Sequence, residues 1–375
     1  MANTMINSIL FFFFFSSTTM FASATAADIK GAYWPSWLQN TLPPSAIPAS
    51  YYTHVFYAFV GISPPNYQLV VKPEDEQWMP IFTTSLHSKT PRVMTMLSIG
   101  GGDSSNRAGF DAMASSPSNR ANFISSTIQV ARRYNFDGLD LDWEYPLTQA
   151  AMVNLGTLLT EWRKAINEEA GRTGKPRLLL TAAVYFTPSA YILSTELTTY
   201  PAQAVRDSLD FVNLMCYDYR GEWDTSKTGA HALLYDPSSQ ISTSAGIQAW
   251  INAGLPANKL IMGLPMYGRT WKLRDPNVNG IGAPAVGVGP GGGVLTYADV
   301  VNFNGVSGTR VVYDARTVSM YSYRGTDWIG YDSPTSIDVK VKYARDNRLG
   351  GYFFWRIGQE KNWELTTQAL RSWAR

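Results

Sequence analysis

Three acidic side chains stand two residues apart near the middle of the chain. Asp140, Asp142 and Glu144 alternate with apolar residues. If this segment is a β-strand, alternate side chains point to the same face, so the three carboxyl groups lie in a row about 6–7 Å apart at each step. Like charges this close in a dehydrated setting cannot all stay ionised, so at least one pKa should be raised. A carboxyl group that is protonated near neutral pH is suited to general acid catalysis.

Two other uses of such a row are a metal site and a polar strand edge that faces water. Three carboxylates could bind a hard cation such as Mg²⁺. However, residues with a period of two on one strand cannot surround an ion without ligands from other strands. His54, His87 and His231 show no metal-ligand spacing. We therefore predict an acid catalyst that needs no metal and no cofactor.

Repeated β-rich runs along the chain indicate the fold that positions these acids. Amphipathic helical segments separate the runs, which indicates a parallel sheet. Eight strand–helix units are the number in a (β/α)8 TIM barrel, an α/β fold whose active site lies at the carboxyl ends of the strands. Glu144 directly follows the fourth run, as this rule requires. The eight runs are residues 30–33, 52–60, 92–99, 138–143, 177–185, 211–217, 259–264 and 350–355.

One long segment interrupts the alternation between the seventh and eighth runs. It extends from about 274 to 347, begins with the Gly/Pro-rich stretch 280–293 and contains two further β-like runs, 309–313 and 327–331. A connection of this length is far longer than an ordinary loop. We predict a small α+β insertion that walls one side of the cleft, within one catalytic domain that spans 27–375.

The amino-terminal residues read as a secretory signal peptide. Residues 1–26 carry no charged side chain, and an apolar run over 9–15 is followed by small residues. This apolar run is too short to span a membrane. We predict secretion to the extracellular space or apoplast, with the vacuole as the alternative, and no membrane partner. The single cysteine, Cys216, excludes an internal disulfide, and a net charge of +2 gives no reason to expect nucleic acid.

The acidic row is part of a pattern that resembles family 18 of the glycoside hydrolases, the chitinases. Residues 137–144 match the DxxDxDxE motif of that family. The stretches at 98–102, 215–218 and 263–269 resemble its SxGG, MxYD and GxPxYGR motifs, and Trp355 stands where the family has a Trp at the floor of the site. The resemblance extends over about 28–373 and is greatest to the class V type from plants.

The resemblance implies a role for each matching residue. Glu144 would be the proton donor and later the base, Asp142 would bind the N–H of the substrate's acetamido group, and Asp140 would share a proton with Asp142. Tyr217 would donate a hydrogen bond to the acetamido oxygen. Further substrate-binding candidates are Asp218, Trp355, Tyr267, Arg269, Tyr33, Phe59 and Trp271. Trp34, Trp37 and Trp223 are additional candidates for stacking on sugar rings.

The implied activity is an endo-acting chitinase that cleaves β-1,4 bonds between N-acetylglucosamine units with retention. In this family the acetamido oxygen of the substrate is the nucleophile, and an oxazolinium ion is formed. The expected partners are chitin or N-acetylglucosamine oligosaccharides, and we expect a monomer. Two alternatives stay open on the sequence: a lectin that binds chitin without cutting it, and a hydrolase specialised for lipid-modified chitin oligomers.

Overall fold

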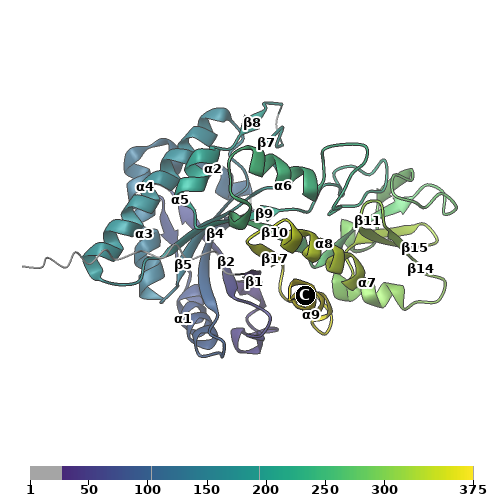
Figure 1. Cartoon of the computed structure of the whole chain (residues 1–375), viewed down its shortest axis with the longest axis horizontal. Helices are drawn as coiled ribbons and strands as arrows, with labels where there is room; N and C mark the ends of the chain where they lie inside the picture. Colours follow the sequence, from purple (N-terminus) through teal and green to yellow (C-terminus); the bar gives the residue numbers. More distant parts are fainter. Residues whose placement is uncertain (1–27, 103, 194, 375) are drawn as a thin grey trace, which may run out of the picture.

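The computed structural model describes residues 28–374, apart from positions 103 and 194. The predicted signal peptide lies outside the described residues. Eight parallel strands form a closed ring, because β1 pairs with both β2 and β17. The predicted TIM barrel is confirmed (Figure 1). In ring order the strands are β1 (Ile29–Pro35), β2 (His54–Ser63), β4 (Met94–Gly101), β5 (Gly138–Trp143), β6 (Leu179–Tyr185), β9 (Phe211–Met215), β10 (Leu260–Pro265) and β17 (Gly351–Trp355).

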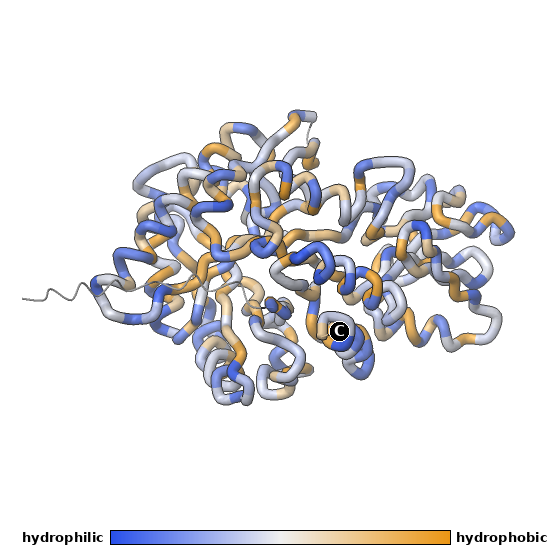
Figure 2. Tube along the Cα trace, in the orientation of Figure 1, coloured by the Kyte–Doolittle hydropathy of each residue, from blue (hydrophilic) through white to orange (hydrophobic). Residues whose placement is uncertain are grey.

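The barrel strands are apolar along almost their whole length because helices cover their outer face and side chains fill the interior. Every residue of β5 is buried, and the hydropathy colouring shows orange strands running through the centre of the barrel (Figure 2). The helices outside the barrel are α1 (Pro73–His87), α2 (Ser104–Ser115), α3 (Pro117–Arg133), α4 (Gln149–Thr173), α5 (Ala202–Ser208), α6 (Thr243–Asn252), α8 (Pro334–Asp346) and α9 (Glu364–Trp373).

Helix α4 shows how the sequence sets the boundaries of these elements. The side chain of Thr148 caps the helix by accepting a hydrogen bond from the backbone N–H of Ala151 at 3.1 Å. Gly174 ends it with a left-handed backbone, φ 68°, which costs a glycine little. Leu155, Leu159 and Trp162 are spaced at three and four residues and are buried on one face. Helix α4 therefore starts, ends and docks where local sequence dictates.

A second, antiparallel sheet projects from the barrel between β10 and β17 (Figure 1, right). Its order is β12-β11-β16-β15-β14, and β13 also pairs with β11. The sheet begins at Tyr267, earlier than the predicted start near 274. Helix α8, within the predicted insertion, packs against α9 and β17 of the barrel. The elements are β11 (Tyr267–Leu273), β12 (Ala285–Val288), β13 (Val294–Thr296), α7 (Tyr297–Asn304), β14 (Arg310–Asp314), β15 (Ser319–Arg324) and β16 (Asp327–Tyr331).

Short elements decorate the loops of the barrel. Strand β3 (Gln68–Val70) pairs with the end of β2, and β7 (Ser189–Ala190) pairs with β8 (Thr198–Thr199) to form a small hairpin after β6. Short 3-10 turns occupy Ser36–Leu38, Pro44–Ala46, Ala257–Lys259 and Pro290–Gly293. Among the described residues, no helix combines the length and apolarity that a bilayer crossing requires.

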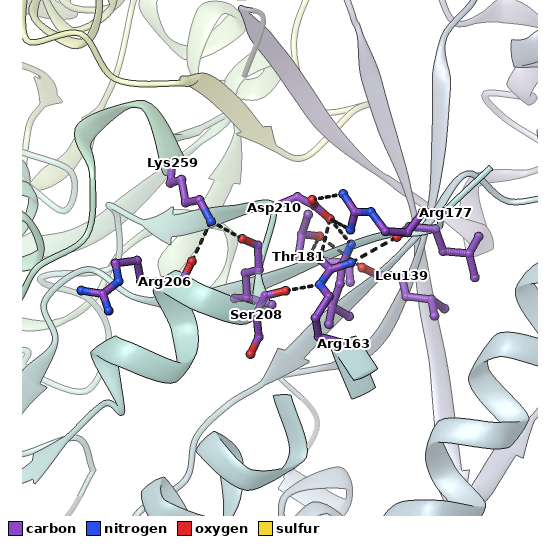
Figure 3. Close-up of polar contacts among 12 residues, drawn as sticks. Leu139, Arg163, Arg177, Thr181, Arg206, Ser208, Asp210 and Lys259 are labelled. Atoms are coloured by element: carbon purple, nitrogen blue, oxygen red, sulfur yellow. Dashed lines mark hydrogen bonds and ion pairs between the residues drawn. The ribbon is translucent and has the colours of Figure 1, made fainter. Parts of the chain in front are cut away.

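Charged side chains tie the helices to the amino ends of the strands, away from the acidic row. Asp210, just before β9, accepts hydrogen bonds from Arg163 at 2.7 Å, from Arg177 at 2.6 Å and from the backbone N–H of Leu180 at 2.8 Å (Figure 3). These contacts keep the pKa of Asp210 below its usual value although burial alone would raise it. Lys259 donates to the carbonyl oxygens of residues 206 and 209 nearby. The cluster fixes α4, α5, β6 and β9 relative to one another.

Candidate active site

The acidic row opens into a cavity of about 480 Å³ at the carboxyl ends of the barrel strands. Asp142 and Glu144 come from β5 and the residue after it, and the other lining side chains come from strands and loops across the ring. The cavity is thus built from segments far apart in sequence that meet only because the sheet closes. Its lining includes Tyr33, Gly102, Asp142, Glu144, Tyr145, Ala183, Tyr185, Met215, Tyr217, Asp218 and Trp355.

Asp140 lies deepest and is fully buried. Its carboxylate accepts hydrogen bonds from the hydroxyl groups of Tyr33 at 2.9 Å, Ser98 at 2.7 Å and Thr181 at 2.7 Å. Burial raises the pKa of Asp140, and the three hydroxyl donors oppose that shift because they stabilise the anion. The three hydroxyl donors leave Asp140 better able to carry a negative charge than Asp142, whose Oδ1 has no such donor.

Asp142 has the opposite surroundings. It is 4% exposed, and its Oδ1 atom has no hydrogen-bond partner among the described residues. Burial raises its pKa well above the usual value, and the charges of Glu144 and Asp140 raise it further. Asp142 therefore gives up its proton less readily than an ordinary aspartic acid. An unpaired buried oxygen that lines a cavity is costly without a ligand, so Oδ1 is positioned to bind a polar group of a substrate.

Glu144 has the properties of a general acid. Burial raises the pKa of its carboxyl group to about 6, a hydrogen bond from Tyr145 lowers it, the negative charge of Asp218 raises it, and the positive charge of Arg107 lowers it. The carboxyl group lines the cavity beside Gly102, where an added Cβ would lie 3.4 Å from Oε1. Glu144 is thus open to a ligand and protonated in a substantial fraction of molecules near pH 6.

Asp218, on the loop after β9, is held as an anion. It accepts hydrogen bonds from the Tyr267 hydroxyl at 2.8 Å and from Arg269 Nε at 2.8 Å, and His231 Nδ1 lies 3.5 Å away. Burial would raise the pKa of Asp218, but His231 and Arg269 together hold it well below its usual range. The fixed negative charge adds to burial in raising the pKa of Glu144.

The floor of the cavity is aromatic. Trp355 lines it, stacks on Phe59 at 5.6 Å between ring centroids, and meets Tyr33 edge to face at 5.6 Å. Tyr217 also lines the cavity, and its ring meets Phe353 edge to face at 6.3 Å between centroids. Phe59 does not line the cavity and supports Trp355 from behind. A flat apolar floor beside a tyrosine hydroxyl suits a small group that has an apolar methyl and a carbonyl oxygen.

Three predicted substrate-binding residues lie behind the cavity wall. Tyr267 and Arg269 do not line the cavity, and they act on it by binding Asp218. Trp271 is 0% exposed, packs on Trp328 at 5.4 Å and donates its ring N–H to the carbonyl oxygen of Asp224. The assignment of Trp271 to the cleft is therefore wrong. Trp271 packs with Trp328 in the apolar core of the second sheet.

The other tryptophan candidates differ in position. Trp34 is fully buried, whereas Trp37 is 55% exposed on the turn after β1 and lies outside the cavity lining. Trp223 lines the cavity and is 59% exposed, with the Arg269 guanidinium 5.0 Å from its ring centroid. Trp223 is therefore the exposed aromatic face best placed for stacking on a sugar.

Several lining residues were not singled out from the sequence. Tyr145 and Tyr185 lie at the ends of strands, so the strand-end rule could have found them. Others lie on the loops after β6 and β9, where no local pattern signals a site: Ile192, Leu193, Arg220 and Ile241. Within the described part of the chain, no group of three or more His, Cys, Asp or Glu residues is arranged to hold a metal ion.

Comparison with known proteins identifies the family. The model of glycosyl hydrolases family 18 matches residues 30–360. The chain belongs to glycosyl hydrolase family 18. It is 48% identical to class V chitinase CHIT5 of Lotus japonicus, over 92% of this chain and 86% of that protein. It is 47% identical to Nod factor hydrolase protein 1 of Medicago truncatula, over 92% of this chain and 90% of that protein.

Solved structures of the same family share the fold closely. A Glu-to-Gln mutant of class V chitinase from Nicotiana tobaccum, in complex with NAG4, has a TM-score of 0.87 and 41% identity, over 93% of this chain and 99% of that chain. The chitinase-like agglutinin of Robinia pseudoacacia has a TM-score of 0.84 and 42% identity, over 92% and 99% of the two chains. This chain is a glycoside hydrolase of the chitinase family, and the agglutinin shows that the scaffold also occurs in a lectin.

Proposed function

We propose that this enzyme hydrolyses β-1,4 bonds between N-acetylglucosamine units with retention, and that the acetamido group of the substrate is the nucleophile. The observation that carries the proposal is the contrast within the acidic row. Glu144 has a pKa raised to about 6, and Asp142 presents an unpaired oxygen to the same cavity. Together they supply a proton donor and an acceptor for an amide N–H, without a second carboxylate nucleophile.

The first step forms one bond and breaks another. The reacting sugar rests over Trp355, and Asp142 Oδ1 accepts the acetamido N–H. The acetamido carbonyl oxygen, oriented by the Tyr217 hydroxyl, attacks the anomeric carbon while Glu144 gives its proton to the bridging oxygen. The leaving sugar departs on the side of Trp223, and the oxazolinium cation that remains is stabilised by Asp142.

The second step restores the enzyme. The Glu144 carboxylate takes a proton from water, and the water oxygen attacks the anomeric carbon from the face that the leaving sugar vacated. The oxazolinium ring opens, and the product has the same anomeric configuration as the substrate. Asp218 keeps its charge throughout, because Arg269 and His231 hold its pKa low. We also propose that the protein is secreted, on the strength of the apolar segment at residues 9–15.

The decisive experiment compares Glu144→Gln with Glu168→Gln, an exposed position on α4 that makes a neutral control. Chitin tetramer and hexamer are incubated with each protein, products are separated, and oligomer binding is measured by calorimetry. Glu144→Gln should lose hydrolysis by at least about 10²–10⁴-fold and keep oligomer binding within a few-fold, while the control behaves as wild type. Wild-type turnover in Glu144→Gln would remove the assignment of the acid, and an initial α-anomer from the wild type would contradict the retaining scheme.

Two alternatives have observable consequences in the same assay. A lectin would bind the hexamer and release no shorter product, and the intact Glu144 argues against that outcome. A preference for lipid-modified chitin oligomers has a specific observation in its favour. Ile192, Leu193 and Ile241 contribute apolar side chains to the cavity lining, and Leu193 is 71% exposed. An acyl chain placed there would remove apolar surface from water, so an acylated oligomer should have a lower KM than its unmodified parent.

A further inference from the structure

Two asparagines of this chain are each followed by a glycine, and this dipeptide is chemically labile. They are Asn279, before Gly280, and Asn304, before Gly305. The backbone nitrogen of the residue after an asparagine can attack the carbon of the side-chain amide, and glycine hinders this attack least because it has no Cβ. Asparagine is accordingly counted among the thermolabile residues. The sequence alone makes the two sites equally reactive, so the fold decides between them.

Asn304 lies at the end of helix α7, where the fold blocks the reaction. The backbone N–H of Gly305 donates hydrogen bonds to the carbonyl oxygens of Val301 and Asn302, at 3.1 Å and 3.2 Å. The Nδ2 atom of Asn304 donates to the Tyr331 hydroxyl at 2.8 Å, and its Oδ1 atom is buried. Attack by the Gly305 nitrogen requires these contacts to break, so reaction at Asn304 depends on local unfolding.

Asn279 lacks this protection. It lies between β11 and β12, outside any helix or strand, and Gly280 is exposed. The backbone N–H of Gly280 has no hydrogen-bond partner among the described residues. The Asn279 side chain donates from Nδ2 to the carbonyl oxygen of Pro276, within the same turn, at 2.9 Å. The nitrogen that must attack is therefore free, and hydroxide from the solvent can reach its proton.

We propose that Asn279 is a site of spontaneous deamidation, which converts it to aspartate and isoaspartate in the folded protein. Hydroxide removes the proton of the Gly280 nitrogen, and this nitrogen forms a bond to Cγ of Asn279. The bond from Cγ to Nδ2 breaks, and ammonia is released. The cyclic imide that remains takes up one water: opening at Cγ gives aspartate, and opening at the backbone carbonyl carbon gives isoaspartate, in which the chain runs through the former side chain.

Isoaspartate at this position disturbs the core of the second sheet, because it makes the backbone longer by one CH2 group. The carbonyl oxygen of Asn279 accepts the ring N–H of Trp328 at 2.9 Å, and that of Gly280 accepts the Thr228 hydroxyl at 2.8 Å. Trp328 is 0% exposed and packs on Trp271. A displaced carbonyl leaves the buried N–H of Trp328 unpaired, which is costly. Aspartate keeps the ordinary backbone and therefore keeps this contact.

The test incubates the full protein at pH 7 and pH 9, below its unfolding temperature, and follows both sites by peptide mass spectrometry with electron-transfer fragmentation. Residue 279 should exchange its amide for a carboxyl group at least about tenfold faster than residue 304, which must first open locally, and faster at pH 9. In denaturant the two rates should become similar. Gly280→Ala should slow the reaction at residue 279 without strain, because an added Cβ meets no atom within 4 Å, whereas Gly305→Ala should leave that rate unchanged.

Equal rates at the two sites in the folded protein would overturn the proposal, and so would an Asn279 that reacts only in denaturant. The isoaspartate form, separated by ion exchange, should have a Tm about 2–4 °C below that of the unmodified protein, while Asn279→Asp should melt close to wild type. An unchanged Tm for the isoaspartate form would overturn the predicted effect on the sheet. Neither readout uses chitin hydrolysis, so the proposal stands or falls separately from the proposed function.

Discussion

The pKa of Glu144 predicts the pH above which the activity of this enzyme should fall. Burial and the negative charge of Asp218 raise the pKa of the carboxyl group to about 6, against the opposing effects of Tyr145 and Arg107. The acid works only when protonated, so the alkaline limb of kcat/KM should turn near pH 6. Glu144 is protonated in about half of the molecules at pH 6 and in about one in eleven at pH 7. Above pH 7, kcat/KM should fall tenfold for each further pH unit.

Two substitutions should move this limb in opposite directions. Arg107→Gln removes a positive charge that lowers the pKa of Glu144, so the limb should move to higher pH. Asp218→Asn removes a negative charge that raises it, so the limb should move to lower pH. Charges at this range in a partly buried site shift a pKa by about 0.5–1.5 units, so the two limbs should lie at least about one unit apart.

The assay is kcat/KM for a fluorogenic chito-oligosaccharide at constant ionic strength from pH 4 to 9. Thermal unfolding at each pH separates loss of catalysis from loss of fold. Arg133→Gln, an exposed arginine whose nearest carboxylate lies 3.6 Å away on α1, is a control that removes the same charge far from the cavity. An alkaline limb above pH 8 in the wild type, or limbs that coincide in the two variants, would refute the reasoning.

Three further outcomes follow from the structure. Tyr217→Phe should lower kcat about 10–100-fold with little change in thermal stability, because Tyr217 lines the cavity and the proposed mechanism uses its hydroxyl as a donor to the acetamido oxygen. Unchanged kcat would exclude that role. Asp210→Asn should lower the free energy of unfolding by about 2 kcal/mol in denaturant titrations, because Arg163 is left without its carboxylate partner, whereas Asp207→Asn should have no measurable effect. Burial raises the pKa of Glu360 to about 7, so folding should weaken as pH rises from about 4.5 to 7, by up to about 3 kcal/mol, and Glu360→Gln should abolish that dependence.

The sign of the last effect distinguishes it from ordinary acid denaturation. The folded state binds a proton at Glu360 more tightly than the unfolded chain does, so the stabilisation is complete below pH 4.5 and is lost as pH rises through 7. Equal pH dependence in wild type and Glu360→Gln would show that other groups are responsible. For Asp210, a loss of stability in the Asp207 control as large as in Asp210→Asn would show that the half-buried ion pair with Arg163 is not the cause.

The barrel could be predicted closely because its local signals agree with one another. The predicted run at 138–143 has the same bounds as β5. Each buried strand is a short apolar run, and a helix such as α4 has an apolar stripe with a capping threonine and a terminal glycine. The second sheet was harder to delimit because β11 continues almost directly from β10, separated only by Met266, so no break in the pattern marks where the barrel stops.

The site residues that lie at regular spacing on a strand could be predicted from the sequence. The site residues that lie on loops were harder to predict. The period of two in the acidic row already implied one face and a raised pKa, and the structure agrees at Asp142 and Glu144. Trp271 was misplaced, because a tryptophan near a strand end has the same sequence signature whether it faces a cleft or the core of a second sheet. Arg220 and Leu193 were missed, because their loops carry no periodic pattern.

The sequence by itself determined the order of elements and the identity of the acid, because both follow from local periodicity and from residue types at fixed spacing. Only the tertiary structure decided how the surroundings of Asp140 and Asp142 differ. Asp140 and Asp142 are neighbours with the same side chain, yet three hydroxyl groups from β1, β4 and β6 surround the first and none reaches Oδ1 of the second. Those donors come from segments 40 or more residues away in the chain, and closure of the barrel is what brings them to Asp140.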